Sequence, residues 1–280
     1  MTRRHDIEKR GRSLDEIRGI MNTMKNLSYM ETRKINDFLD VQHSVVKHIT
    51  TVAADFLSFY PETLTENTDT PVDVYLLIGT ERGFCGDFNH VLLRHFETMP
   101  ITHTTDKMRL ITVGHKLEML LQDDERVILF IDGASVAEEV GNVLNQIVNQ
   151  LASIQEQYGL LNLYVLYQDD EHKLITQQLL PPFQHLLHHQ PQQPHAPVLN
   201  LEPKKFLLEL SYHYLFLVLY EILYTSLIAE NRQRMAHLEG AVQHMDEQSE
   251  ELHRQYNVLR QEEIIEEIEV ILLSAASLDE

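Results

Sequence analysis

The chain has 280 residues, of which 43% are hydrophobic and 24% are charged, and its formal net charge at pH 7 is −20. This composition is typical of a globular protein that is long enough to bury a core. A strongly acidic chain is a poor general binder of nucleic acid, because neutralising phosphates requires Lys and Arg, and it is equally unsuited to an anionic membrane surface. We therefore expect no nucleic-acid partner.

The N-terminal segment and the longest apolar run bear on cellular location. Residues 1–10 are charged and contain no apolar run, so we expect no secretory signal. The longest apolar stretch, Tyr214 to Tyr224, is too short to span a bilayer and contains Glu221, so we expect no direct membrane insertion. The single cysteine, Cys85, cannot form an intrachain disulfide. These features predict a soluble cytosolic protein.

Both ends of the chain are predicted to be long helices. All nine prolines lie between residues 61 and 203, and proline interrupts helix interiors. At each end the apolar residues repeat at alternating steps of three and four, which is the spacing of a coiled-coil seam. The N-terminal seam consists of Ile17, Ile20, Met24, Leu27, Ile35, Phe38, Val41, Val45, Ile49, Val52, Phe56 and Phe59. The C-terminal seam consists of Met235, Leu238, Val242, Met245, Leu252, Tyr256 and Leu259, and it then shifts by one position to Ile264, Ile268 and Ile271.

The length of the last helix requires a partner. A helix from Phe206 to Leu278 would be about 110 Å long at 1.5 Å per residue, which is too long to be buried in a globule of this size. It must pack along another long helix, and the N-terminal helix is the natural partner. We therefore predict an antiparallel coiled coil formed by the two ends of the chain.

The middle of the chain is predicted to be an α/β domain. Short runs rich in Val, Ile, Leu and Tyr alternate with helix-like segments, which implies a mainly parallel sheet covered by helices. The predicted strands are Val72–Ile78, Arg109–Val113, Val127–Ile131, Leu161–Tyr167 and Leu174–Leu180. The predicted helices are Phe88–Glu97, His115–Gln122 and Ser135–Tyr158.

A glycine-rich segment, residues 79–89, follows the first predicted strand. Three closely spaced glycines after a strand could cradle a phosphate, so a nucleotide-binding enzyme built on the sheet is one hypothesis. The spacing does not support it, because the segment has neither the Gly-Lys-Ser/Thr of a P-loop nor the Gly-x-Gly of a dinucleotide fingerprint. We favour a tight strand-to-helix connection in which glycines adopt positive φ.

The same segment carries a family resemblance. Its motif, Arg82-Gly83-Phe84-Cys85-Gly86-x-Phe88-Asn89, resembles a segment of the gamma subunits of F-type ATP synthases, the central rotor shafts of those enzymes. Glu81 stands where that family has Asp, and Asp87 where it has a second Gly. In the family this segment belongs to the globular domain and is not catalytic, which implies a structural role for Arg82, Gly83, Cys85, Gly86 and Asn89.

Both ends of the chain resemble the same family. The Thr23-Met24-Lys25 stretch is similar to the family's N-terminal helix, in the form found in its divergent, alternative (Na⁺-type) branch. Leu201-Glu202-Pro203 resembles the segment that leads into the last helix, and Tyr256-Asn257-x-x-Arg260-Gln261 resembles a motif within it. Ile265 stands where the family often has a Thr that touches the catalytic ring, and His244 and Val270 stand in place of Asn and Glu.

The resemblance implies a non-catalytic rotor subunit. It implies that Met24, Lys25, Arg260 and Gln261 contact a ring of alpha and beta subunits, and that Leu201, Glu202 and Pro203 begin a foot over the membrane c-ring. An epsilon-type subunit would meet the α/β domain. No catalytic residue, cofactor or metal is expected, and the location implied is the cytoplasmic side of the inner or plasma membrane. The alternative is a coiled-coil scaffold or adaptor unrelated to ATPases.

The predicted architecture is therefore α/β plus long helices. Residues 1–60 and 204–280 form the coiled coil, and residues 70–200 form an inserted Rossmann-like α/β domain.

Two features of the sequence are not explained by this architecture. The histidines at 185, 188, 189 and 195 could bind a metal, but we favour a solvated loop because no Cys or paired carboxylate lies at metal-site spacing. The last helix is strongly acidic, and its glutamates cannot all face the basic N-terminal helix.

Overall fold

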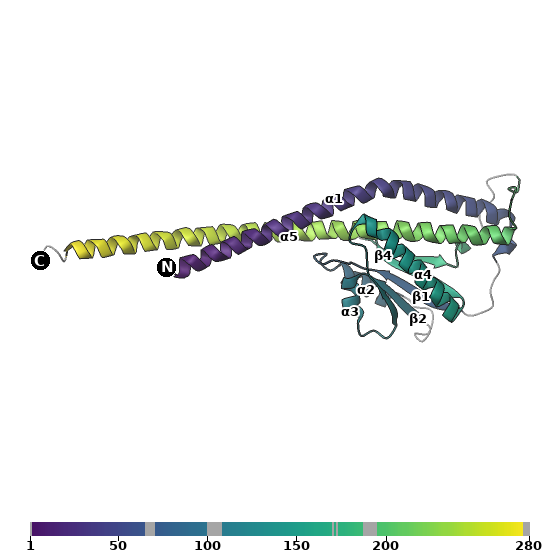
Figure 1. Cartoon of the computed structure of the whole chain (residues 1–280), viewed down its shortest axis with the longest axis horizontal. Coiled ribbons are helices and arrows are strands. Elements are labelled where there is room, and N and C mark those ends of the chain that lie inside the picture. Colours follow the sequence, from purple (N-terminus) through teal and green to yellow (C-terminus); the bar gives the residue numbers. More distant parts are fainter. Residues whose placement is uncertain are drawn as a thin grey trace. The chain divides into compact units, whose positions relative to one another are not determined.

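The computed structural model describes residues 2–64, 71–99, 108–169, 171, 173–186 and 195–276 (Figure 1). The chain forms two compact units. A sheet-containing unit comprises Tyr29–Arg234, and a helical unit comprises Met1–Ser28 with Met235–Glu280. Helix α1 (Thr2–Phe59) and helix α5 (Pro203–Ala276) each contribute to both units. The predicted long terminal helices are confirmed, and α5 begins at the last proline of the chain.

The sheet has five strands in the order β3-β2-β1-β4-β5. Four are parallel, and β5 pairs antiparallel to β4 at one edge. The strands are β1 (Val72–Ile78), β2 (Met108–Val113), β3 (Val127–Ile131), β4 (Leu161–Gln168) and β5 (Leu174–Leu180). All five predicted strands are therefore confirmed, to within one residue at each end. The connecting helices are α2 (Phe88–Thr98), α3 (His115–Leu121) and α4 (Val140–Tyr158).

Alternation along β1 divides the core into two layers. Val74, Leu76 and Ile78 face a large apolar cluster that also includes residues of α1, α4 and α5. Tyr75 and Leu77 face a second cluster made with α2 and α3. Because successive strand residues point to opposite faces, this one central strand anchors both layers. The sheet is thus covered on one face by α4 and the long helices, and on the other by α2 and α3.

Helix α5 is strongly apolar where it crosses the sheet-containing unit, with Val218, Leu219 and Ile222 among its buried residues. An 18-residue window of this helix is long and apolar enough, by length and composition alone, to cross a membrane, and a third of that window is buried in the structure. The sequence expectation considered only an uninterrupted apolar run, which is shorter. The core helix of a soluble protein passes the same test, so this window carries no conclusion about a membrane.

In the helical unit α1 and α5 run antiparallel. Arg4 pairs with Glu263, Arg18 with Asp246, and Lys25 with Glu239, so the partners occur in opposite order along the two helices. The predicted coiled-coil arrangement is confirmed in this unit. The seam on α5 is also largely as predicted: Leu238 and Val242 are buried, and Met245, Leu252, Tyr256 and Leu259 are half-buried.

The predicted shift of the α5 seam beyond Leu259 is wrong. Ile264, Ile268 and Ile271 are 44–64% exposed, and the next residue in phase with the seam is Glu263, which is half-buried and pairs with Arg4. Among the described residues α1 begins at Thr2, and its Arg4 is level with Glu263 of α5. Figure 1 shows α5 continuing past the N-terminus of α1.

Much of the predicted seam on α1 is also wrong by one position. In the helical unit Ile17, Ile20 and Leu27 are exposed, whereas Ser28 is buried. In the sheet-containing unit Phe38, Val41 and Val45 are exposed, whereas Thr32 and Leu39 are buried. Ile35 and Phe56 of the predicted seam are buried as expected. The buried stripe has the same spacing of three and four, but several of its members are small or polar. Counting apolar residues does not detect such side chains.

The two registers can be distinguished by stability. We expect Leu39→Ala to lower the free energy of unfolding by about 2–5 kcal/mol, because it leaves a cavity in the main core. Val41→Ala, which lies on the predicted seam but is 65% exposed, should change it by less than about 0.5 kcal/mol. Urea denaturation followed by tyrosine fluorescence measures both. A larger effect at Val41 than at Leu39 would restore the register expected from apolar spacing.

Candidate functional site

The glycine-rich segment forms the tight connection expected between β1 and α2. Phe84 and Gly86 both have positive φ, at 65° and 57°. A Cβ on Gly79 would lie 2.6 Å from the Cβ of Leu117, so no larger residue fits there. Asn89, at the start of α2, accepts a hydrogen bond from the Thr80 N–H (3.0 Å) and donates one to the Thr80 hydroxyl (2.9 Å). The motif residues therefore brace a turn.

Glu81 ties together the carboxyl ends of the parallel strands. Its Oε2 accepts hydrogen bonds from the backbone N–H of His115 (2.9 Å), just after β2, and of Gly133 (2.7 Å), just after β3. Backbone N–H groups at this edge of a parallel sheet are the donors that bind phosphate in nucleotide-binding proteins. Here a carboxylate of the chain itself occupies them. This geometry argues against the hypothesis of a nucleotide-binding enzyme.

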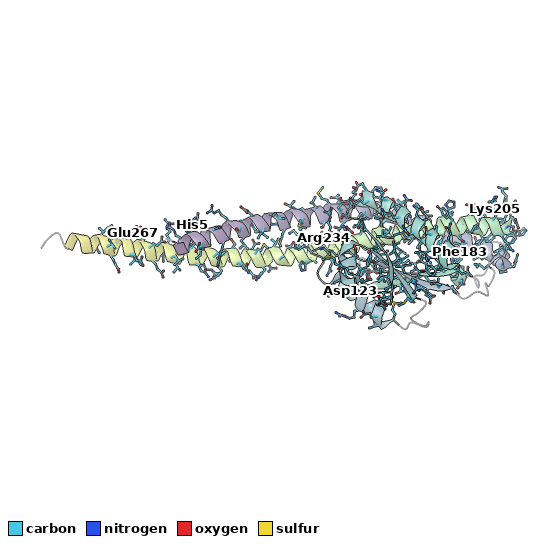
Figure 2. The ribbon with its side chains drawn as sticks, turned by 60° about the horizontal axis from the view of Figure 1, so that its bottom comes forward. His5, Asp123, Phe183, Lys205, Arg234 and Glu267 are labelled. Carbon is cyan, nitrogen blue, oxygen red and sulfur yellow. The ribbon has the colours of Figure 1, made fainter. Side chains whose placement is uncertain are left out.

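A buried ion pair on α5 holds the same loop by its backbone. One member of the pair, Arg234, is labelled in Figure 2. The side chains of Glu230 and Arg234 are 4% and 5% exposed, and they pair with each other one helical turn apart. Glu230 accepts hydrogen bonds from the backbone N–H of Glu81 and of Arg82, both at 3.4 Å. Arg234 donates to the carbonyl of Gly83 at 3.2 Å and to the side chain of Asn231 at 2.8 Å. We call residues 81–83 with Glu230 and Arg234 the loop clamp.

Electrostatics in the loop clamp are those of a site that is nearly closed to water. Burial raises the pKa of Glu230, while Arg234 and the two backbone N–H groups lower it. Burial, followed by the charge of Glu230, raises the pKa of the nearby Cys85 thiol to about 12. A thiol with this pKa stays protonated at neutral pH and is a poor nucleophile. Cys85 packs instead against Phe88 and Ala229, which agrees with a structural role.

The residues expected to contact a ring do not lie together. Lys25 pairs with Glu239, so Met24 and Lys25 lie at the level of Glu239 on α5. Arg260 and Gln261, both exposed, lie about 30 Å further along α5 at 1.5 Å per residue. The residues that are expected to contact the ring therefore lie at two separate levels along the helical unit.

The expected foot residues lie where α5 begins. Leu201 and Glu202 are exposed, and the carbonyl of Glu202 accepts a hydrogen bond from Phe206 N–H, which starts the helix at Pro203. Proline is favoured at the first position of a helix, because its missing N–H has no partner there in any case. Two of the four clustered histidines, His188 and His189, lie outside the described residues. Among the described residues no three His, Cys, Asp or Glu side chains could hold a metal ion.

Sequence reasoning missed half of the loop clamp. It singled out Arg82, Gly83, Cys85, Gly86 and Asn89 but gave no role to Glu230 and Arg234, whose partners lie about 150 positions earlier. One signal was available: a Glu and an Arg four residues apart directly follow a run of apolar residues. Charges in such a place are usually paired, because burying them unpaired is costly.

Comparison with known proteins links this architecture to rotary ATP synthases. Residues 3–278 match the family model described as ATP synthase. Two similar solved structures come from Euglena gracilis mitochondrial ATP synthase. Its rotor has a TM-score of 0.63 with 94% of this chain and 99% of that chain covered, and an OSCP/F1/c-ring structure has a TM-score of 0.64 with 99% and 95% covered.

The central stalk and c-ring structure of Tetrahymena thermophila mitochondrial ATP synthase has a TM-score of 0.56, with 79% of this chain and 99% of that chain covered. Sequence identity is 16% in all three cases, so these structures establish the fold alone. No curated protein matches the chain.

The loop clamp makes a prediction about stability. Glu230→Ala should lower the free energy of unfolding by about 3–5 kcal/mol, because it leaves the Arg234 charge buried and unpaired. Replacing both residues, as Glu230→Leu with Arg234→Met, should cost less than the single change, since no unpaired charge remains. Urea denaturation measures these values, with Glu209→Ala, an exposed position on the same helix, as the control.

Labelling of Cys85 reports on the loop itself. A thiol reagent should react faster with native Glu230→Ala than with the wild-type chain, because the loop over the buried thiol is released. Unchanged stability and an unchanged labelling rate would show that the clamp does not hold the loop.

Proposed function

The chain belongs to the gamma-subunit family of ATP synthases, and from this premise we propose how its parts divide the work of a rotary shaft. It is the central-stalk rotor subunit, which couples ion flow through a membrane ring to ATP synthesis or hydrolysis in an α3β3 ring. Its partners are alpha, beta and epsilon-type subunits and the c-ring, in a membrane-bound complex. Because the chain belongs to this family, the alternative hypothesis of a coiled-coil scaffold unrelated to ATPases is wrong.

The observation that carries the division of work is the antiparallel helix pair of the helical unit. A single shaft inside a ring of three catalytic subunits touches each of them differently at any instant. Such differential contact is what biases a site between conformational states, and rotation carries each site through all of them. We propose that the helical unit contacts the ring, and that residues 70–200, with the C-terminal part of α1 and the start of α5, form the foot.

Chemistry is assigned to the ring and not to this chain. Two observations support a non-catalytic role: Glu81 occupies the phosphate-binding edge of the sheet, and the thiol of Cys85 is protonated and buried. The purified chain should therefore hydrolyse no ATP. Turnover that is abolished by a point substitution in this chain would overturn this assignment.

The loop clamp gives the foot a mechanical connection to the shaft. Torque can pass between a sheet and a helix only through contacts that do not slip. A buried pair that is hydrogen-bonded to the loop backbone at Glu81, Arg82 and Gly83 has only one arrangement in which all of these hydrogen bonds are made.

We propose that Leu201, Glu202 and Pro203 begin the part of the foot over the c-ring, on the cytoplasmic side of the inner or plasma membrane.

The end of α5 has the surface expected of a segment that another protein covers. Its large apolar residues are 44–65% exposed at six of the nine positions from Ile264 to Leu272: Ile264, Ile265, Ile268, Val270, Ile271 and Leu272. Exposed apolar surface of this density marks a protein interface. Glutamates occupy the positions between these residues. The inner surface of a ring that covers this segment must therefore be apolar in part and must also carry positive charge that compensates the glutamates.

The first test concerns the proposed contact of Arg260 and Gln261 with the ring. Arg260→Ala with Gln261→Ala should weaken coupling between rotation and catalysis, or assembly, because charged hydrogen bonds of this kind contribute about 1.5–3 kcal/mol. The chain should stay folded, since both residues are exposed. The matched control is Arg254→Ala with Gln255→Ala, the same residue types on the same helix, whose surface contacts are with Glu251. Equal effects of the two pairs on ATP-driven ion pumping would contradict a specific contact at Arg260 and Gln261.

The second test concerns the acidic end of α5. Glu266 and Glu267 are exposed and lie C-terminal to Glu263, which pairs with Arg4 of α1. We expect Glu266→Lys with Glu267→Lys to impair assembly with the ring, and wild-type assembly to weaken as salt rises, because the Debye length falls to about 3 Å at 1 M. Native gels of reconstituted complexes measure both. Normal assembly and turnover of the double variant would mean that these glutamates form a solvated face only.

A further inference from the structure

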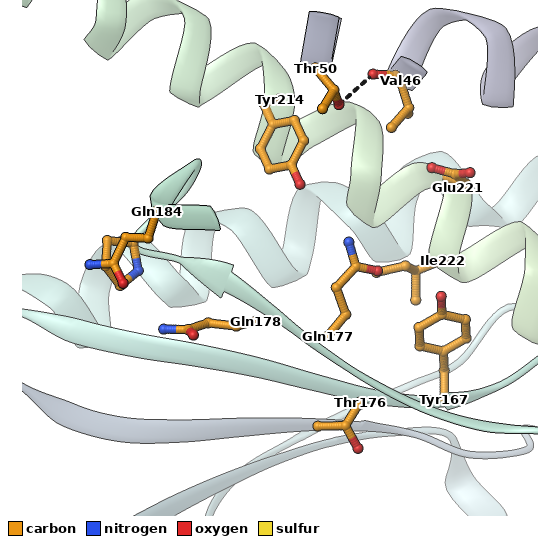
Figure 3. Close-up of a pocket in the computed structure, with 11 residues that line it drawn as sticks. Val46, Thr50, Tyr167, Thr176, Gln177, Gln178, Gln184, Tyr214, Glu221 and Ile222 are labelled. Carbon is orange, nitrogen blue, oxygen red and sulfur yellow. Dashed lines mark hydrogen bonds between the residues drawn. The ribbon is translucent and has the colours of Figure 1, made fainter. Parts of the chain in front are cut away.

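The sheet-containing unit has a partly open cavity of about 610 Å³ that the rotor function does not use. Two residues of α1, three of α5 and residues of β4, β5 and the turn after β5 line it. Figure 3 shows Tyr214 and Glu221 of α5 facing Gln177 and Tyr167 of the sheet across this space. Cavities that bind small molecules have volumes of roughly 300–1,000 Å³, so this one is large enough for an organic ligand.

The cavity has one charged wall residue, and that residue is acidic. The Glu221 side chain is 20% exposed and contacts the imidazole of His43, with 2.9 Å between Oε1 and Nε2. Among the residues that the structure describes, no Lys or Arg lines the cavity. Burial raises the pKa of Glu221 and the charge of His43 lowers it, with burial the larger cause. Burial thus disfavours the charged form of Glu221 more than His43 favours it. A cationic ligand beside the carboxylate would stabilise the charged form.

The neutral groups of the wall add acceptors and aromatic faces. The rings of Tyr167 and Tyr214 come from different elements, and these residues are 8% and 5% exposed. The amide of Gln177 and the hydroxyl of Thr50 also line the cavity, and the latter already donates its proton to the Val46 carbonyl at 2.8 Å. Its oxygen remains free to accept. A carboxylate together with tyrosine rings is a combination that recognises ammonium groups, through charge and through cation–π attraction.

Other ligand classes fit less well. Phosphates and nucleotides would meet a carboxylate with no Lys or Arg to offset it. A metal ion would need several ligands, and no group of three His, Cys, Asp or Glu exists among the described residues. We propose that this cavity binds a small organic ammonium ion, a primary amine or polyamine, with its ammonium group at Glu221 and its chain beside Tyr167 and Tyr214.

Calorimetry on the full chain tests the proposal. The probes are ethanolamine, putrescine and spermidine, titrated at pH 7.5 in 150 mM NaCl so that diffuse attraction to the net charge is screened. At least one should bind saturably, with a stoichiometry of one. Glu221→Gln, which keeps the size and removes the charge, should weaken that binding by about tenfold or more, a loss of about 1.4 kcal/mol. Tyr167→Phe should weaken it by about threefold, because only the hydroxyl is lost.

Glu209→Gln is the matched control, since Glu209 lies on the same helix, in the same unit, and is exposed. It should leave the affinity unchanged, and thermal melting should show that all three variants are folded. Equal weakening by Glu209→Gln and Glu221→Gln would show diffuse attraction to an acidic protein and would overturn the proposal. So would saturable binding that Glu221→Gln leaves intact, or the absence of saturable binding by all three amines.

Discussion

The structure of the sheet-containing unit depends on the buried pair of Glu230 and Arg234. A buried ion pair is not by itself a strong source of stability, because removing two charges from water costs about as much as their attraction returns. Its effect is on arrangement. Once both charges are buried, every position of the loop that leaves them without Glu81, Arg82 and Gly83 is costly. The pair therefore fixes the position of the loop on α5.

Glu81 extends the same logic across the sheet. Its backbone is held by Glu230, and its carboxylate holds the N–H groups that follow β2 and β3. Three strand ends and a long helix are thus linked through one residue. The edge that binds phosphate in other α/β proteins is here an internal connection. A Rossmann-like topology does not bring nucleotide chemistry with it, because function depends on which groups the edge presents.

The long helices show how packing, and not propensity, decides which face is used. Isolated helices are marginal in water, and most of their stability comes from an apolar face that packs. Helix α5 packs broadly in the sheet-containing unit and narrowly in the helical unit, and its last turns expose apolar residues such as Ile271 and Leu272. This gradient fits a shaft that is held firmly at one end and that meets other proteins at the other.

The sequence by itself determined the architecture. Proline placement marked both long helices, and runs of β-branched and aromatic residues marked all five strands, because these are local constraints on backbone conformation. The same reasoning recognised the turn at Gly79–Asn89 and its structural character. It could not choose between two helical stripes one position apart, and it chose the more apolar one on α1.

Only the tertiary structure decided which stripe is buried and what the loop touches. Ser28 is buried in place of Leu27, and Leu39 in place of Phe38, because the packing of α1 against the rest of the fold selects the stripe. Glu230 and Arg234 meet a loop about 150 residues earlier in the chain, and no local pattern can specify a contact over that separation. Such contacts exist only once the chain has folded and the charges must find partners away from water.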